Sequence, residues 1–175
     1  MSLMITNETL KGFFGENDAQ AVYQALKATD GFLDFAQRFM HDEAAQVARN
    51  ALWVLTKATD EELSVLQPIR NELIDLAMTT KHSSVRRLSL NIVERLEMYE
   101  EDMRTEFLDF CVDHALDIEE PPGVQAICMK LAYRMSKFYP DLMDELKRTI
   151  AAMEIEYYKP AVKCVRNRFL KGKLK

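Results

Sequence analysis

Apolar residues follow helical spacing in four nine-residue segments of the chain. The segments are VARNALWVL from Val47, VRRLSLNIV from Val85, VQAICMKLA from Val124 and VKCVRNRFL from Val162. Counted from the first valine, the apolar positions fall three, five, seven and eight residues later, as in Val85, Leu88, Leu90, Ile92 and Val93, with Asn50 and Asn167 as exceptions. This spacing is typical of a helix with a broad buried stripe. The segments start 38, 39 and 38 residues apart. This spacing predicts an internal repeat, with one such helix in each copy.

A second helix-like segment precedes each of these four. The preceding segments are GFLDFAQRFM, PIRNELIDLAM, TEFLDFCVDHAL and DLMDELKRTIAAM, and the motif FLDF starts at both Phe32 and Phe107, which are 75 residues or two periods apart. Each repeat is therefore predicted to be a helical hairpin. We expect a single domain over residues 1–175, with an N-terminal helical cap at 1–30 and hairpins at approximately 31–58, 60–97, 100–138 and 140–172.

Local signals support these helix boundaries. Thr59–Glu62 reads TDEE, the pattern of a capping box, and Pro140 is suited to a first helical turn. Ser83 and Ser84 are predicted to cap the helix that follows them. Pro68 lies inside the first helix of the second hairpin, where it removes a backbone donor and is expected to bend that helix.

Together these features resemble the HEAT and armadillo class of α-solenoids. The resemblance covers roughly residues 31–172 and rests on the paired helices, the period near 40, the proline in a first helix and the Val85-Arg86 pair that opens a second helix. It implies an all-α superhelix whose second helices line a concave surface. It does not imply one function, because the class includes scaffolds, transport factors and subunits of enzymes.

The composition agrees with a helical protein and bears on its expected location in the cell. Apolar residues make up 48% and charged residues 29%, with only five glycines and five prolines. No uncharged run approaches the roughly 18 residues of a membrane span, and the first residues lack the blocks of a signal peptide. We therefore expect a cytoplasmic protein with no membrane contact. The spacing of Cys111, Cys128 and Cys164 fits neither a disulfide framework nor a CxxC metal site, and three buried, reduced thiols are expected.

The sequence contains no recognisable catalytic, cofactor or metal motif. The glycines do not form a phosphate-binding loop, and the three histidines fall in different repeats. Cys111 and His114 could supply half of a zinc site, but no second pair completes it. We expect neither catalytic residues nor a metal or cofactor, and hence a protein that is not an enzyme.

Charge is strongly segregated between the two helices of the repeat. The second helices, taken as residues 46–58, 84–96, 123–137 and 160–172, carry twelve Lys or Arg and one acid, whereas the rest of the chain carries 11 basic and 27 acidic residues. Some of this bias has a structural explanation, because cations near helix C-termini are stabilised by the helix dipole. The first-turn residues Arg49, Arg86, Arg87 and Lys163 are not explained in this way. A basic inner face is therefore predicted.

The expected function is a non-enzymatic binding or scaffold module whose basic face binds a protein or acidic peptide. Trp53 is the only tryptophan, and in the aligned helices its position is taken by Asn91, Lys130 and Arg168. The alignment thus leaves two positions open for its ring, the core or a partly exposed site between Arg49 and Lys57. The predicted binding residues are Arg49, Trp53, Lys57, Arg86, Arg87, Lys130, Arg134, Lys163 and Arg168. The alternative is a nucleic-acid-binding protein that resembles the HEAT-like DNA alkylation repair proteins.

Overall fold

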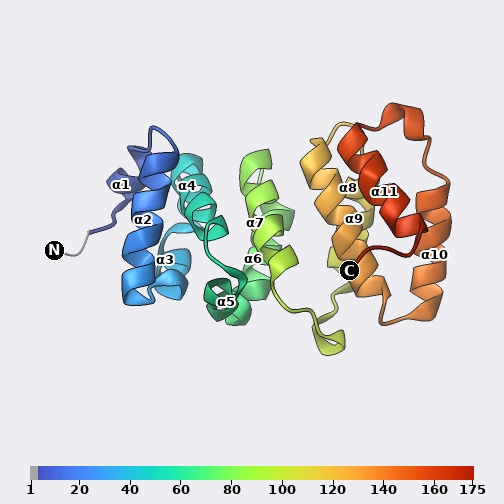
Figure 1. Ribbon diagram of the computed structural model, residues 1–175, viewed down its shortest axis with the longest axis horizontal. Coiled ribbons are helices and arrows are strands. Elements are labelled where there is room, and N and C mark those ends of the chain that lie inside the picture. The colour runs from blue at the N-terminus through green and yellow to red at the C-terminus, as the bar shows by residue number, and fades with distance from the viewer. Residues whose placement is uncertain (1–3) are drawn as a thin grey trace. The chain divides into compact units, whose positions relative to one another are not determined.

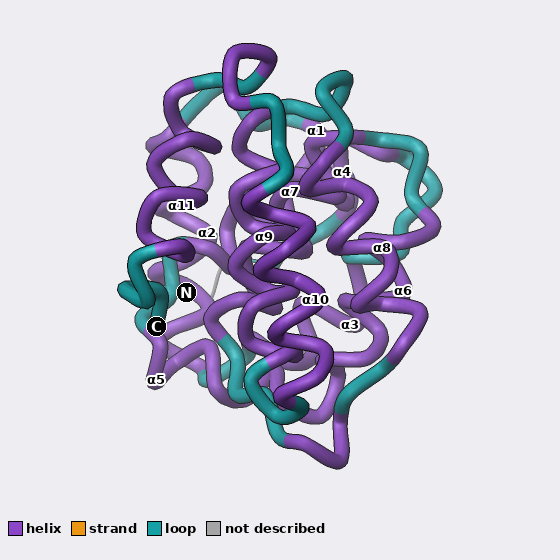
Figure 2. Tube along the Cα trace, turned by 90° about the vertical axis from the view of Figure 1, so that its right-hand side faces the viewer, coloured by secondary structure: helices purple, strands orange, loops and turns teal. Residues whose placement is uncertain are grey.

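Helices form all of the regular secondary structure in residues 4–175, the part of the chain that the computed structural model describes. Figure 2 shows these helices joined by loops, with no strand in the described range. The first three residues of the predicted cap at 1–30 lie outside this range. The chain divides into two compact units, with the boundary in the sequence between Leu96 and Glu97.

The N-terminal unit is organised around one second helix. α4 packs against α1, α2 and α3 on the side of the cap and first hairpin, and against α7 of the next hairpin, which in turn packs on α6. Figure 1 shows α4 between α2 and α7. The elements are α1 (Asn7–Lys11), α2 (Glu16–Thr29), α3 (Phe32–Phe39), α4 (Ala45–Thr56), α5 (Asp60–Leu63), the 3-10 helix η1 (Ser64–Ile69), α6 (Arg70–Thr79) and α7 (Ser83–Arg95).

The C-terminal unit is organised around α9 in the same way. α9 packs against α8, its partner in the hairpin, and against both α10 and α11 of the last hairpin. The elements are the 3-10 helix η2 (Glu100–Asp102), α8 (Thr105–Leu116), α9 (Pro122–Ser136), α10 (Pro140–Ala151), the 3-10 helix η3 (Ile155–Tyr157) and α11 (Pro160–Leu170). Pro122, Pro140 and Pro160 each occupy a first helical turn, where the missing N–H costs nothing.

The predicted capping box is present at the start of α5. The Thr59 side chain accepts a hydrogen bond from the Glu62 N–H (3.1 Å), and Glu62 accepts one from the Thr59 N–H (2.9 Å). Glu62 also accepts a 2.7 Å hydrogen bond from the Tyr23 hydroxyl of α2. These hydrogen bonds hold the pKa of Glu62 below its usual value. The bond from the Thr59 N–H has the larger effect, and the bond from the Tyr23 hydroxyl has the next largest. This carboxylate therefore joins the cap helix α2 to the start of the second hairpin.

Pro68 interrupts the first helix of the second hairpin, as expected. The chain is a 3-10 helix up to Ile69 and continues as α6 from Arg70, so the helix changes type next to the proline. The prediction that Ser83 and Ser84 cap the following helix is wrong. α7 begins at Ser83 itself, and His82 is the N-cap residue without a side-chain hydrogen bond. Both serines already have helical backbone, whereas a capping side chain requires the extended conformation that His82 adopts (φ −103°, ψ 115°).

The cysteines are only partly as expected. Cys111 and Cys128 are buried, but Cys164 is exposed. Cys164 lies two positions after the buried Val162, and this places it off the apolar stripe of α11. The prediction of three buried thiols is therefore wrong for Cys164.

The buried stripe of the second helices yields a stability prediction. Ile92 of α7 is fully buried, whereas its neighbour Asn91 is half-buried. Ile92→Ala is expected to lower the free energy of unfolding by about 2 to 5 kcal/mol through lost contacts and a cavity, and Asn91→Ala by no more than about 0.5 kcal/mol. Urea unfolding of both variants measures the difference. Equal effects would show that the helix phase derived from the repeat is incorrect.

Candidate binding site

Three of the predicted binding residues form one row on α4. Arg49, Trp53 and Lys57 are spaced by four residues and so share one face of the helix. The Trp53 ring is half-buried, with the Arg49 guanidinium carbon 5.9 Å and the Lys57 Nζ 5.3 Å from its centroid. Both distances lie within the usual range of cation–π contacts. Of the two positions that the sequence leaves open, the structure shows the partly exposed one.

The cap holds this row in place. The Phe13 ring meets Trp53 edge-to-face at 6.2 Å, and Lys57 forms an ion pair with Glu16 at the start of α2. Arg49 is exposed and donates to Asn50 (3.1 Å). We call Phe13, Arg49, Trp53 and Lys57 the Trp53 cluster. Because Lys57 already has a carboxylate partner, Arg49 is the cation that the cluster presents to solvent.

Sequence reasoning missed the aromatic part of this surface. Phe13 and Phe14 lie in the loop between α1 and α2, and Phe14 is 100% exposed. A pair of phenylalanines between Gly12 and Gly15 is a signal that could have been noticed, because a loop has no buried stripe to absorb such side chains. Phe14 therefore adds a fully exposed aromatic next to Phe13, the residue whose ring contacts Trp53.

Arg86 has a structural task that the sequence did not reveal. Its guanidinium donates to the carbonyls of Ala77 (3.0 Å) and Thr80 (2.7 Å), at the C-terminal end of α6. Arg166 of α11 does the same for Ile150 (3.1 Å) and Ala151 (3.2 Å) at the end of α10.

Arg95 acts across hairpins in a similar manner. It donates to the carbonyls of Thr56, the last residue of α4, and of Ala58 in the loop that follows, and it pairs with Asp60 at 2.8 Å. The last carbonyls of a helix lack intrahelical partners, and a guanidinium satisfies them and the dipole together. Part of the positive charge on second helices therefore serves helix ends rather than a partner.

The remaining predicted residues differ in exposure. Arg87 of α7 is exposed, whereas Lys130 and Arg134 of α9 are half-buried. Tyr133 lies between them in sequence, and its ring meets Phe169 of α11 edge-to-face at 5.4 Å and Lys137 at 5.4 Å from Nζ to centroid. The structure thus places an aromatic among cations on α9 as well as on α4.

Four cations lie together on α11 and the turn that follows it. Lys163, Arg168, Lys171 and Lys173 line a hollow of about 510 Å³ together with Cys164 and Asn167, and no carboxylate lines it. Among the described residues none of these four cations has an ion-pair partner. We call Lys163, Arg168, Lys171 and Lys173 the α11 cluster; Lys171 and Lys173 were not among the predicted site residues.

A turn at Gly172 brings Lys173 into this cluster. Gly172 has a left-handed backbone (φ 66°), and the N–H groups of Gly172 and Lys173 donate to the carbonyls of Phe169 (3.0 Å) and Arg168 (2.8 Å). This is a Schellman motif, in which glycine is favoured because it accepts positive φ without strain. The chain turns back after α11, and Leu174 becomes buried.

The buried thiol of Cys111 lies in an environment that disfavours the thiolate. Burial raises the pKa of the Cys111 thiol well above its ordinary value, and a hydrogen bond with Cys128 adds to the shift. Such a thiol is a poor nucleophile. In residues 4–175 no three His, Cys, Asp or Glu side chains are placed to hold one metal ion.

Comparison with known proteins identifies the family. The fold is that of an α-solenoid built from helical hairpins, and a family model described as a HEAT repeat domain matches residues 6–173. The chain therefore belongs to the HEAT repeat family, which confirms the resemblance that its repeat carries. No curated protein and no solved structure gives a match. None of the described helices is long and apolar enough to cross a membrane.

The exposure of Trp53 can be tested through its fluorescence. Iodide and acrylamide should both quench the emission, and Arg49→Gln should reduce quenching by iodide while leaving that by neutral acrylamide unchanged, because Arg49 attracts the anion to the ring. Arg38→Gln, on exposed α3 surface, removes the same charge and should change neither. Emission that resists both quenchers would place the ring in the core.

The capping task of Arg86 predicts unequal effects of two adjacent arginines. Arg86→Met should lower the free energy of unfolding by about 1 to 3 kcal/mol, since it leaves the end of α6 without its charged donor. Arg87→Met, at an exposed neighbour, should stay within about 0.5 kcal/mol. Urea unfolding compares the two, and an equal loss would contradict the capping assignment.

Proposed function

We propose that this HEAT repeat protein is a binding module for an acidic segment of a protein partner, with the α11 cluster as its principal contact. HEAT repeat domains are interaction modules rather than catalysts as a rule, and they bind extended partners along their second helices. The observation that carries the proposal is the set of four cations on one helix and its following turn, with no carboxylate among them. Like charges held together in this way repel one another, and an acidic ligand relieves the repulsion.

The Trp53 cluster supports the same function in the N-terminal unit. Its ring supplies rigid contact area, and Arg49 supplies attraction and orientation, which is the combination typical of interface anchors. The interface residues proposed are thus the Trp53 cluster, Arg87, Lys130, Arg134 and the α11 cluster, whereas Arg86 has its hydrogen bonds to α6 and is the weakest member of the predicted set.

Two exposed residues of the α11 cluster provide the test. Arg168→Glu with Lys171→Glu should weaken binding of a fluorescent deca-glutamate peptide at least about tenfold and flatten its salt dependence, because each lost cation removes an attraction that salt screens. The melting temperature should not change, since both side chains are exposed. Fluorescence anisotropy at several salt concentrations gives the affinities.

Lys147→Glu with Arg148→Glu is the matched control. Both residues are exposed on α10 and the change of charge is identical, so the affinity should stay close to that of the parent protein. Equal losses of affinity in the two double variants would show that only the net charge of the protein matters, and not the α11 cluster. If the parent protein instead binds a DNA duplex at about 50 mM salt and not the peptide, the nucleic-acid alternative replaces this proposal.

A further inference from the structure

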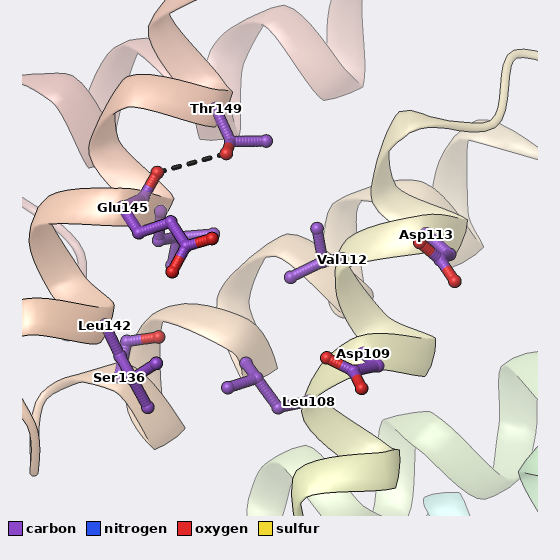
Figure 3. Close-up of a pocket in the computed structure, with 9 residues that line it drawn as sticks. Leu108, Asp109, Val112, Asp113, Ser136, Leu142, Glu145 and Thr149 are labelled. Atoms are coloured by element: carbon purple, nitrogen blue, oxygen red, sulfur yellow. Dashed lines mark hydrogen bonds between the residues drawn. The ribbon is translucent and has the colours of Figure 1, made fainter.

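The C-terminal unit also contains a cavity of opposite character. It has a volume of about 300 Å³ and lies between α8 and α10, with the end of α9 as its floor. Figure 3 shows side chains of α8 and of α10 facing each other across it. The side chains of Leu108, Val112, Leu142 and Leu146 give it apolar walls.

The floor of this cavity holds a hydroxyl group without a partner. Ser136 is 1% exposed, and its Oγ has no hydrogen-bond partner among the described residues. Figure 3 shows Ser136 beside Leu142, with its oxygen turned towards the cavity. Buried polar groups are nearly always paired, so this hydroxyl at the bottom of the cavity is open to a partner from outside the described residues.

The rim of the cavity carries three carboxylates. Asp109 and Asp113 are four residues apart on α8, and Glu145 projects from α10. All three are exposed, and none of their carboxylate groups forms an ion pair or hydrogen bond within residues 4–175. The only hydrogen bond drawn in Figure 3 runs from the Thr149 hydroxyl to the Glu145 backbone carbonyl (3.0 Å). The rim therefore attracts a cation.

Apolar walls, an acidic rim and a buried acceptor together define the chemistry of the ligand. The walls suit an aliphatic stem, and the carboxylates suit a cationic head group. A guanidinium has five N–H donors in a planar fork, enough to serve a carboxylate and the Ser136 hydroxyl together. These carboxylates are not placed to converge on a metal ion, since no metal-binding group occurs in the described residues.

We propose that this cavity binds an arginine side chain of a basic segment in a protein partner. The volume is at the lower end of the range for ligand pockets, about 300–1,000 Å³, and suits one side chain. Three carboxylates exceed the charge of one cation, so a segment with a second basic residue matches the rim better than a small molecule does. This site is separate from the α11 cluster and does not depend on the function proposed for it.

The experiment uses the whole chain and three defined probes. Acetyl-arginine amide should shift the methyl NMR signals of Leu108 and Leu142, whereas acetyl-citrulline amide, its uncharged isostere, should not. Acetyl-Arg-Ala-Arg-amide should bind about tenfold more tightly than the single arginine, because its second cation reaches another carboxylate. Absence of shifts with either arginine probe overturns the proposal, as do equal shifts with citrulline.

Variants separate the cavity from general surface charge. Glu145→Gln should weaken binding of the two-arginine peptide about tenfold. Asp144→Asn removes the same charge from an exposed neighbour that does not line the cavity, and it should leave the affinity within about twofold. Equal losses in these two variants would contradict the site.

Ser136→Ala tests the floor of the cavity. The affinity should fall several-fold while the melting temperature stays equal or rises, because the variant removes an unpaired hydroxyl from a buried position. Unchanged affinity would remove the hydroxyl from the site and overturn the arrangement proposed. If the peptide gains nothing over the single arginine, the occupant is a small cationic molecule. If sedimentation shows a dimer that Glu145→Gln abolishes, the occupant is a second copy; either result overturns the assignment to a partner protein.

Discussion

The structure depends on the burial of a broad apolar stripe on each second helix. A single hairpin cannot cover such a stripe, because its first helix shields only one side. α4 is covered by the cap, by α3 and by α7, and α9 is covered by α8, α10 and α11. On these two helices, polar side chains are left with the face that the neighbouring helices do not cover. Arg49 of α4 and Lys130 and Arg134 of α9 keep some exposure there. The charge segregation visible in the sequence thus becomes a surface property only in part, because other arginines of the second helices bind the ends of neighbouring helices.

The parts of the site that the sequence predicted are those that depend on spacing within one helix. Arg49, Trp53 and Lys57 share a face because they are four residues apart, and no tertiary information is needed to place them together. The hairpins followed from the recurrence of apolar positions in the same way. Helix ends were harder, as the start of α7 at Ser83 shows, because several residues in a row have suitable side chains and the packing of the loop decides which conformation each adopts.

The features that the sequence did not predict all depend on contacts between separate segments. Arg86 and Arg166 resemble other surface cations until the end of the preceding helix is located in space. Lys173 joins the α11 cluster only because Gly172 turns the chain back. The cavity between α8 and α10 combines Asp109 with Glu145 from another helix, and the unpaired Ser136 hydroxyl arises from the packing of α9 beneath them. A periodic pattern within one helix does not predict contacts between separate helices.

The three capping arginines have a consequence for how the protein unfolds. Arg86 and Arg166 each join the two helices of one hairpin, so in a nearest-neighbour description of the solenoid they add to the intrinsic stability of a repeat. Arg95 reaches from α7 to the end of α4 and to Asp60, and so adds to the coupling between the first two hairpins. Cooperativity in a linear array comes from coupling of this second kind. Local openings at the start of α5 are therefore expected to depend on the integrity of α7, and we expect these two hairpins to exchange their amide protons as one unit.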